Sequence, residues 1–446
     1  MARRSGRLGR LTGTRAVRGA AVGGALALAL ALAPAPATAA PGPVAATPPA
    51  TPPGPSTMPF DPAKLRATLD ATHDAGMYGV FSEARDGNTS WDGASGVADV
   101  RTGRPVTSTM RQRVGSITKS FVATAILQQV EKGRISLDAP IARYAPDLVP
   151  GPLGQQITVR MLLNHTSGIG DYVGTAFPSF TELSPASLDE FRFRDVRPEQ
   201  LITWGLQAPR TGEPGERWSY SNTNYIIAGR LLEKATGTKA EKYITRNVIN
   251  KAGLKHTYFP SSPWIAEPHS RMYESLYQHV KPPRDYSTYN MSWAWTAGEL
   301  VSTMDDLNRF YRRLLTGGLI GTNTLAQMKR TVPVKDADGN VLMNYGLGLY
   351  SLDLPCGTFW GHDGAVFGAG TQSLSSAGGA RQISLALNLM KYQQLNANGT
   401  PVPHPIDNAL GAHVVEALCG TQAAAWSTGP ERPLRLLPLQ SLHAPR

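Results

Sequence analysis

The sequence predicts an α+β protein in which an antiparallel sheet is flanked by helices, with a long, mainly helical region inserted along the chain. Strand-like runs appear early, at 78–83 and 90–97, and return late, beyond residue 346. The chain between them, at about 134–288, has helical periodicity and long proline-containing connections. We therefore expect the early and late strands to complete one antiparallel sheet.

The early elements follow from local signals. Pro62, followed by apolar residues at helical spacing, predicts a first helix. The two early strands are joined through Asp86-Gly87-Asn88, a strong hairpin signal. A second turn at 101–104 leads to an apolar run that starts at Ser116 and reaches Gly133, where a helix would stop.

The later elements are read in the same way. Ser302-Thr303 and the acids after them predict the start of another helix. The inserted region should contain helices at 158–164, 197–206, 222–234 and 240–250, and the late strands should lie at 346–352, 358–362, 368–375 and 382–389.

Both ends of the chain differ in composition from the part that should fold. Residues 1–39 resemble a secretory signal peptide, with six arginines and no acid before an Ala/Leu run and a small-residue cleavage site. Residues 40–59 are a Pro-rich linker, and 421–446 read as a disordered tail. The folded domain is therefore expected at 60–420, in a secreted protein. An uncleaved anchor and twin-arginine export stay open.

The charge balance argues against a nucleic-acid partner. The formal net charge of +11 falls to about +5 without the six arginines of the predicted signal. No cluster of lysines and arginines interleaved with aromatic residues is present. A weak contact with an anionic cell wall such as peptidoglycan stays open.

The two cysteines, Cys356 and Cys419, both lie in the part of the chain that would be exported. An oxidising compartment lets such thiols pair, so we predict one disulfide that ties the last helix to a strand. Two free buried thiols are the alternative. Neither arrangement offers the Cys/His spacing of a metal site.

Ser116 and Lys119 are the candidate reactive pair. Residues three apart on a helix share a face, so the serine hydroxyl and the lysine amine can meet at the first turn. The unpaired N–H groups of that turn favour negative charge developing beside the serine. A Ser-x-x-Lys match by itself is more often a capping serine beside a solvated lysine, so partner motifs must decide.

Two further clusters follow at later positions, Tyr220-Ser221-Asn222 before an apolar helix and His362-Asp363-Gly364 in the strand-rich end. Alone, each has a structural explanation, because a tyrosine is often buried and an asparagine often caps a helix. Their order and their predicted elements make the three clusters specific as a set.

These three clusters resemble the signature of the serine β-lactamase and penicillin-binding family, which includes Ser-x-x-Lys and two partner motifs. The Tyr-x-Asn and His-x-Gly forms look like the soluble D-alanyl-D-alanine carboxypeptidase branch, which is close to class C β-lactamases and related esterases. The similarity covers roughly 59–420, and includes the stretches at 162–168, 214–224, 297–303 and 345–349. It implies a β-lactamase/DD-peptidase-like fold.

The resemblance implies roles for the reactive groups. Ser116 would be the nucleophile that forms an acyl-enzyme, Lys119 part of its base system, and Tyr220 the proton shuttle. Asn222 would orient the substrate amide and the lysine. His362 would add a polarising donor across the cleft.

The resemblance also implies how the substrate is held. Backbone N–H groups of Ser116 and Ala365 would form the oxyanion hole, and Gly364 would let its strand approach the ligand. Trp293 would line the cleft while Trp295 packs into the core. His165 is read as structural, because its motif lies away from the catalytic trio.

The match weakens at the subsite for a terminal carboxylate. Where the carboxypeptidase branch places an arginine and a threonine, this sequence has Tyr350 and Ala365, and Asp363 adds a negative charge nearby. Recognition of a carboxylate is charge-assisted, so the evident anchor is missing.

Three functions remain consistent with the sequence. The first is a secreted serine hydrolase acting through an acyl-serine, nearest to a D-alanyl-D-alanine carboxypeptidase. The second is an esterase or β-lactamase that uses the same residues, and the third is a non-catalytic penicillin- or cell-wall-binding module. The expected partner is a small molecule or peptide (D-alanyl peptide, β-lactam or ester), and no metal or organic cofactor is implied.

Overall fold

The computed structural model of the chain describes residues 60–336 and 339–420. The predicted signal peptide, the Pro-rich linker and the predicted tail lie outside these residues. Within them, none of the helices combines the length and the apolar character needed to cross a membrane.

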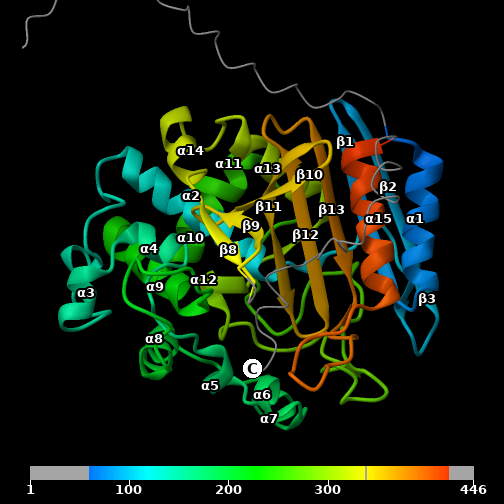
Figure 1. The fold of residues 1–446 in the computed structure, drawn as a ribbon, viewed down its shortest axis with the longest axis horizontal. Helices are drawn as coiled ribbons and strands as arrows, with labels where there is room; N and C mark the ends of the chain where they lie inside the picture. Colours follow the sequence, from blue (N-terminus) through cyan, green and yellow to red (C-terminus); the bar gives the residue numbers. More distant parts are fainter. Residues whose placement is uncertain (1–59, 337–338, 421–446) are drawn as a thin grey trace, which may run out of the picture. The chain divides into compact units, whose positions relative to one another are not determined.

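One antiparallel sheet organises the described residues (Figure 1). Its nine strands, counted over 60–336 and 339–420, run in the order β3-β2-β1-β13-β12-β11-β10-β9-β8. The early hairpin joins the late strands through β1 and β13, with Val80 opposite Leu387. The bounds are β1 Gly79–Asp86, β2 Thr89–Asp99, β3 Arg104–Pro105, β8 Val332–Lys335, β9 Val341–Tyr345, β10 Tyr350–Leu354, β11 Gly357–Val366, β12 Ala369–Ser376 and β13 Arg381–Leu387.

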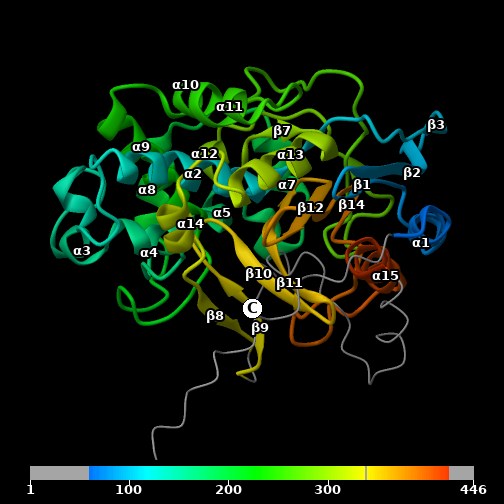
Figure 2. The same ribbon diagram turned by 90° about the horizontal axis from the view of Figure 1, so that it is seen from above.

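Helices cover both faces of this sheet (Figure 2). Helices α1, Pro62–Asp74, and α15, Pro405–Cys419, pack against each other and against β1. Helix α13, Met304–Leu315, packs against β1, β12 and β13. The buried apolar residues form two clusters, one containing residues of α1 and α15 and the other residues of α2 and α13. The fold is therefore the predicted α+β arrangement.

The inserted region is mainly helical, as predicted. It also contains two short strands, β5 Tyr273–Glu274 and β6 Arg284–Asp285, which the sequence analysis missed. Its helices and helical turns are η2 Ile141–Arg143, α3 Pro152–Gln156, α4 Val159–Leu163, α5 Val173–Ala176, α6 Ser179–Glu182, α7 Ala186–Phe191, α8 Pro198–Gln207, α9 Asn222–Thr236, α10 Ala240–Ile244, η3 Thr245–Ile249 and α11 Asn250–Ala252.

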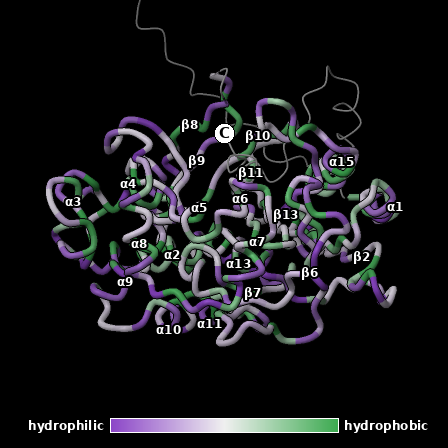
Figure 3. Tube along the Cα trace, turned by 90° about the horizontal axis from the view of Figure 1, so that it is seen from below, coloured by the Kyte–Doolittle hydropathy of each residue, from purple (hydrophilic) through white to green (hydrophobic). Residues whose placement is uncertain are grey.

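Shorter elements connect this region to the sheet. They are β4 Gln112–Arg113, η1 Gly115–Ile117, α12 Trp295–Gly298, β7 Val301–Ser302, α14 Thr322–Met328 and β14 Leu389–Met390. Strand β4 lies just before η1 and pairs with β7. This pairing holds the part of the chain that leads through η1 into α2. Figure 3 shows hydrophilic and hydrophobic residues interleaved along α13, as expected for a helix with one face on the sheet.

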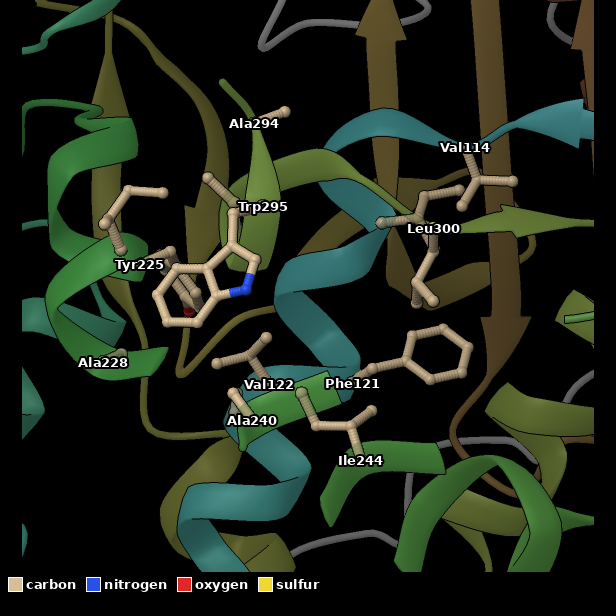
Figure 4. Close-up of a cluster of buried hydrophobic side chains, with 14 of the residues drawn as sticks. Val114, Phe121, Val122, Tyr225, Ala228, Ala240, Ile244, Ala294, Trp295 and Leu300 are labelled. Atoms are coloured by element: carbon tan, nitrogen blue, oxygen red, sulfur yellow. The ribbon is translucent and has the colours of Figure 1, made fainter. Parts of the chain in front are cut away.

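Helix α2, Thr118–Glu131, is the central helix of the larger apolar cluster. Its residues from Thr118 to Gln129 are all buried, so it has almost no solvent face. Figure 4 shows Phe121 and Val122 of α2 in a cluster with Tyr225 and Trp295. A helix buried on all sides gives its first turn a fixed position.

Three local predictions need correction. The predicted strand at 346–352 begins at Tyr350, because 346–349 turns the chain from β9 into β10. The predicted helix at 240–250 changes to a π-helical stretch at Thr245–Ile249. Ser116 lies in a 3₁₀ turn rather than in α2 itself. In each case, a tertiary contact or a local turn overrides apolar periodicity.

A disulfide joins Cys356 to Cys419, with Cα atoms 5.4 Å apart. Cys419 ends α15, but Cys356 lies in the turn between β10 and β11 rather than in a strand. The bond therefore fastens the terminal helix to the sheet strands that continue into the His362 motif.

Replacing both cysteines, Cys356→Ser and Cys419→Ser, should lower the free energy of unfolding by about 4 kcal/mol, because the closed loop spans 63 residues. Urea unfolding followed by tryptophan fluorescence measures the change. A reductant should lower the unfolding midpoint of the wild type and leave that of the double variant unchanged. Equal midpoints for wild type and variant without reductant would contradict the prediction.

Candidate active site

Ser116 lies at the base of a cleft, in the turn that leads into α2. Lys119 follows one turn later, and its Nζ is 2.9 Å from Ser116 Oγ. The predicted meeting of the two side chains is therefore present. Because α2 is buried on all sides, both groups are held by the centre of the fold.

Lys119 is fully buried and has three polar partners at its amine. Besides Ser116, Nζ donates to Asn222 Oδ1 at 2.8 Å and to the carbonyl oxygen of Ala297 at 2.7 Å. Both of these oxygens can only accept. A neutral amine has two N–H groups for them and keeps its lone pair for the hydroxyl proton of Ser116, which is the arrangement of a general base.

The protonation of Lys119 fits this role. Burial lowers the pKa of Lys119 to about 7, although the carboxylates of Asp171 and Asp363 act in the opposite direction. A large fraction of the amine is then neutral near pH 7. General bases work best when their pKa lies near the operating pH.

Asn222 is held in place by Asp171. The backbone N–H and Nδ2 of Asn222 donate to Asp171 Oδ2 at 3.0 and 2.8 Å, and the other carboxylate oxygen accepts from the N–H of Val173. These bonds fix which end of the Asn222 amide faces Lys119. Asp171 thus positions Asn222, and its charge acts on the lysine.

Tyr220 lies beside both reactive groups. Lys119 Nζ is 4.9 Å from the centre of the Tyr220 ring. Burial raises the pKa of Tyr220 well above its usual value, although a hydrogen bond with Ser116 acts in the opposite direction. The phenol therefore keeps its proton, which suits a group that passes a proton between the serine and a leaving group.

His165 supports the Tyr220 ring from behind. The two rings stack with centres 4.2 Å apart, and Nδ1 of His165 accepts from the N–H of Ser221. His165 is fully buried and does not line the cleft. This placement fits the structural role predicted from the sequence.

Two glycines allow strand β11 to approach the turn that carries Ser116. A Cβ on Gly364 would lie 2.0 Å from the carbonyl oxygen of Val114, and one on Gly115 would lie 2.7 Å from the N atom of Ala365. Any side chain at either position would force the two elements apart. The close approach puts the N–H groups of Ser116 and Ala365 in neighbouring positions, as an oxyanion hole requires.

His362 lies next to the site and faces away from the cleft. Its ring is fully buried, with Nδ1 donating to the carbonyl oxygen of Asp363 and Nε2 2.8 Å from the hydroxyl of Tyr345. Burial, together with the charge of Lys119, lowers the pKa of His362 to about 3. A neutral ring with this pairing has no N–H left for a substrate, so its donor role stays a prediction that this geometry does not favour.

The cleft above Ser116 has a volume of about 260 Å³. Trp293, Asp363, Gly364 and Ala365 line it, as predicted from the sequence. Trp295 instead packs in the apolar cluster (Figure 4), and its indole N–H donates to Glu241. Tyr350 is fully buried against Gln372 and does not line the cleft, so its predicted substrate contact is not seen.

The charges that line the cleft are mainly negative. Asp171, Asp363 and Asp407 contribute carboxylates. Among the described lining residues the one cation is Lys391, whose Nζ lies 3.0 Å from the carboxylate of Glu274, while the Lys119 amine lies behind the lining, beside Ser116. No group of three His, Cys, Asp or Glu side chains suited to a metal ion occurs at 60–336 or 339–420.

Two groups of the site, Asp171 and the carbonyl of Ala297, were not predicted from the sequence. Both contact the Ser116–Lys119 pair or Asn222 from chain segments far away in sequence. Asp171 follows the stretch at 162–168, and Ala297 begins the stretch at 297–303, both of which belong to the resemblance. The signal that could have indicated these two residues was their position in or beside a stretch that resembles the family.

The fold and the site define a protein of the serine hydrolase superfamily that includes β-lactamases and penicillin-binding proteins. The model of the Beta-lactamase family matches residues 65–389, and the chain belongs to that family. The family predicted from the sequence and the predicted fold class are both confirmed.

Two relatives are informative. Esterase EstB of Burkholderia gladioli is 31% identical over 220 residues, 47% of this chain and 55% of that protein. The putative penicillin-binding protein PbpX of Bacillus subtilis is 27% identical over 260 residues, 57% of this chain and 59% of that protein. The chain thus aligns with little more than half the length of these two relatives.

A solved structure matches over more of its length. The D-stereospecific amidohydrolase from Streptomyces sp. is 37% identical, with a TM-score of 0.67, and the match covers 74% of this chain and 95% of that one. An esterase, a penicillin-binding protein and an amidohydrolase are thus all similar to this chain.

The rate of ester hydrolysis should depend on pH through Lys119. We expect kcat/KM for p-nitrophenyl acetate to rise with an apparent pKa of about 7 and then level off, because only the neutral amine accepts the Ser116 proton. A pH profile from 5.5 to 9 measures this. A flat profile over that range would exclude Lys119 as the base.

The variant Asp171→Asn tests whether the pH profile of p-nitrophenyl acetate hydrolysis follows the pKa of Lys119. Removing a carboxylate that raises the pKa of Lys119 should move the inflection to lower pH. The control Asp147→Asn, at an exposed residue paired with Lys234, should leave the inflection in place.

Proposed function

We propose that the protein hydrolyses amides and short peptides of D-amino acids through an acyl-enzyme formed on Ser116, and that it prefers substrates with a free α-amine. The observation that carries this proposal is that Asp363, with a fully buried side chain, lies in the wall of the cleft where the resemblance expects groups that bind a substrate carboxylate. Asp363 would attract an ammonium group and repel a carboxylate. The similarity to a D-stereospecific amidohydrolase supports the D-configuration.

Acylation would begin when the substrate carbonyl lies above Ser116. Its oxygen would accept from the N–H groups of Ser116 and Ala365, which are prepared for the negative charge of the tetrahedral intermediate. Neutral Lys119 would take the hydroxyl proton as the Ser116 oxygen bonds to the carbonyl carbon.

Collapse of the intermediate breaks the bond to the amine, which needs a proton to leave. Tyr220 is placed to donate this proton, and the proton that Lys119 took from Ser116 restores the phenol. Water then attacks the acyl-serine, and the same groups act in reverse order, so the product is a free acid and the enzyme is restored.

Two other activities remain as candidates. A D-alanyl-D-alanine carboxypeptidase would act beside a free carboxylate, and Tyr350, which stands at the position of the expected arginine, does not reach the cleft. An esterase or β-lactamase needs less from that subsite, and the similarity to EstB favours an esterase. A non-catalytic binding module would not need the hydrogen bonds that join Ser116, Lys119 and Asn222.

The test compares D-phenylalanine amide, L-phenylalanine amide, N-acetyl-D-phenylalanine amide and an N-acetylated D-alanyl-D-alanine peptide. We expect D-phenylalanine amide to give the highest kcat/KM. Ser116→Ala should abolish all turnover. Asp363→Asn should reduce kcat/KM for the free-amine amide about tenfold or more, because a charge-assisted hydrogen bond contributes about 1.5–3 kcal/mol.

Hydrolysis of p-nitrophenyl acetate on the high-pH plateau serves as the control, since this ester has no ammonium group and Asp363→Asn, which removes a charge that acts on the pKa of Lys119, should retain the plateau rate. Faster release of D-alanine from the blocked peptide would favour a carboxypeptidase. A penicilloyl adduct on Ser116, seen by intact mass, would favour penicillin binding, and rapid penicillin opening a β-lactamase. Ester hydrolysis without amide hydrolysis would favour an esterase.

We also propose that the protein is exported and acts outside the cell, where its substrates could include peptides from peptidoglycan. The predicted signal at 1–39 and the Cys356–Cys419 disulfide support export, since disulfides persist in oxidising compartments. N-terminal sequencing of the protein from the culture medium should begin at Ala40. Recovery of the uncleaved chain from the cell membrane would contradict the proposal.

A further inference from the structure

We propose that a basic pocket along the solvent-facing side of α13, separate from the active-site cleft, binds a phosphate-bearing anion. The pocket has a volume of about 430 Å³. We call it the α13 pocket, and it is lined by Arg85, Lys251, Ala252, Gly253, Asp305, Arg309, Arg312 and Arg313. None of these residues lines the cleft above Ser116.

The cations of the α13 pocket come from three elements. Arg309, Arg312 and Arg313 lie three and four residues apart on α13, so they share one face of that helix. Arg85 comes from β1 and Lys251 from α11, and both elements pack against α13. Tertiary folding, rather than a run of basic sequence, therefore brings the five cations together.

Carboxylates neutralise only part of this charge. Asp305 pairs with Arg309 at 3.1 Å, and Glu83 lies 3.5 Å from Arg85. Burial and the Asp305 charge raise the pKa of Glu83 to about 7, so Glu83 carries less than a full negative charge near neutral pH. No carboxylate lies within ion-pair distance of the three remaining cations over the described ranges: Lys251, Arg312 and Arg313.

The position of Arg312 is fixed by a neutral partner. Its Nε and Nη2 donate to Gln382 Oε1 at 3.2 and 3.1 Å, and Gln382 is held by its own bonds to Asn308 and Ser375. Burial lowers the pKa of Arg312, and the positive charges of the neighbouring Arg85 and Arg309 lower it further. A bound anion would relieve this repulsion, and the groups that receive it are already in place.

The arrangement favours phosphate among anions. A guanidinium presents paired N–H donors that match two oxygens of a phosphate or a carboxylate. Several guanidinium groups from different directions can use the additional oxygens of a tetrahedral phosphate, which a flat carboxylate lacks. The ligand could be a small soluble phosphate or a phosphate-containing polymer, because both present the same chemistry.

Calorimetric titration of the mature protein with inorganic phosphate, pyrophosphate and linear polyphosphate tests the proposal. We expect saturable binding of at least one probe. The variant Lys251→Ala/Arg313→Ala should weaken that binding at least tenfold, because both side chains are exposed pocket cations. Hydrolysis of p-nitrophenyl acetate should not change, which also shows that the variant folds.

The matched control is Lys64→Ala/Arg101→Ala, which removes the same charge from exposed residues outside the pocket. This control should bind as the wild type does. Similar affinities for pyrophosphate and polyphosphate would identify a small phosphate ligand, and much tighter binding of polyphosphate would identify a polymer. Absence of saturable binding, an unchanged affinity of the pocket variant, or equal losses in both variants would overturn the proposal.

Discussion

The rest of the site depends on the burial of one amine. Lys119 is fully enclosed, and loss of hydration lowers the pKa of Lys119 to about 7. Without this burial the amine would stay protonated near neutral pH and could not accept the Ser116 proton. Its two neutral acceptors, Asn222 Oδ1 and the Ala297 carbonyl, leave the lone pair directed to the serine. The buried helix α2 encloses the Lys119 amine, and the hydrogen bonds between Asn222 and Asp171 keep Asn222 Oδ1 directed at that amine.

The site also requires the backbone of strand β11 to lie close to the turn that carries Ser116. Strand β11 can lie against the Ser116 turn because Gly115 and Gly364 have no side chains there. The same strand places Asp363 in the wall of the cleft and His362 against Tyr345, and both side chains are fully buried. Neighbouring residues of one strand therefore face different surroundings, because successive side chains point to opposite faces of a sheet.

Electrostatics distinguishes the active-site cleft from the α13 pocket. The active-site cleft collects carboxylates, which favours a substrate with a cationic group, whereas the α13 pocket collects arginines on another part of the fold. The two sets of residues do not overlap. A preference for an ammonium group at Ser116 and binding of a phosphate at α13 can thus coexist on one chain.

The sequence by itself determined what depends on local spacing: the early hairpin, the contact between Ser116 and Lys119, and the positions of the strands near Gly364. Long-range packing decided the rest. Apolar periodicity did not reveal that 346–349 is a turn, and no spacing indicated that Asp171 would reach Asn222. The burial of an amine, the direction of a strand side chain and the convergence of arginines depend on the path of the whole chain, so only the tertiary structure decided them.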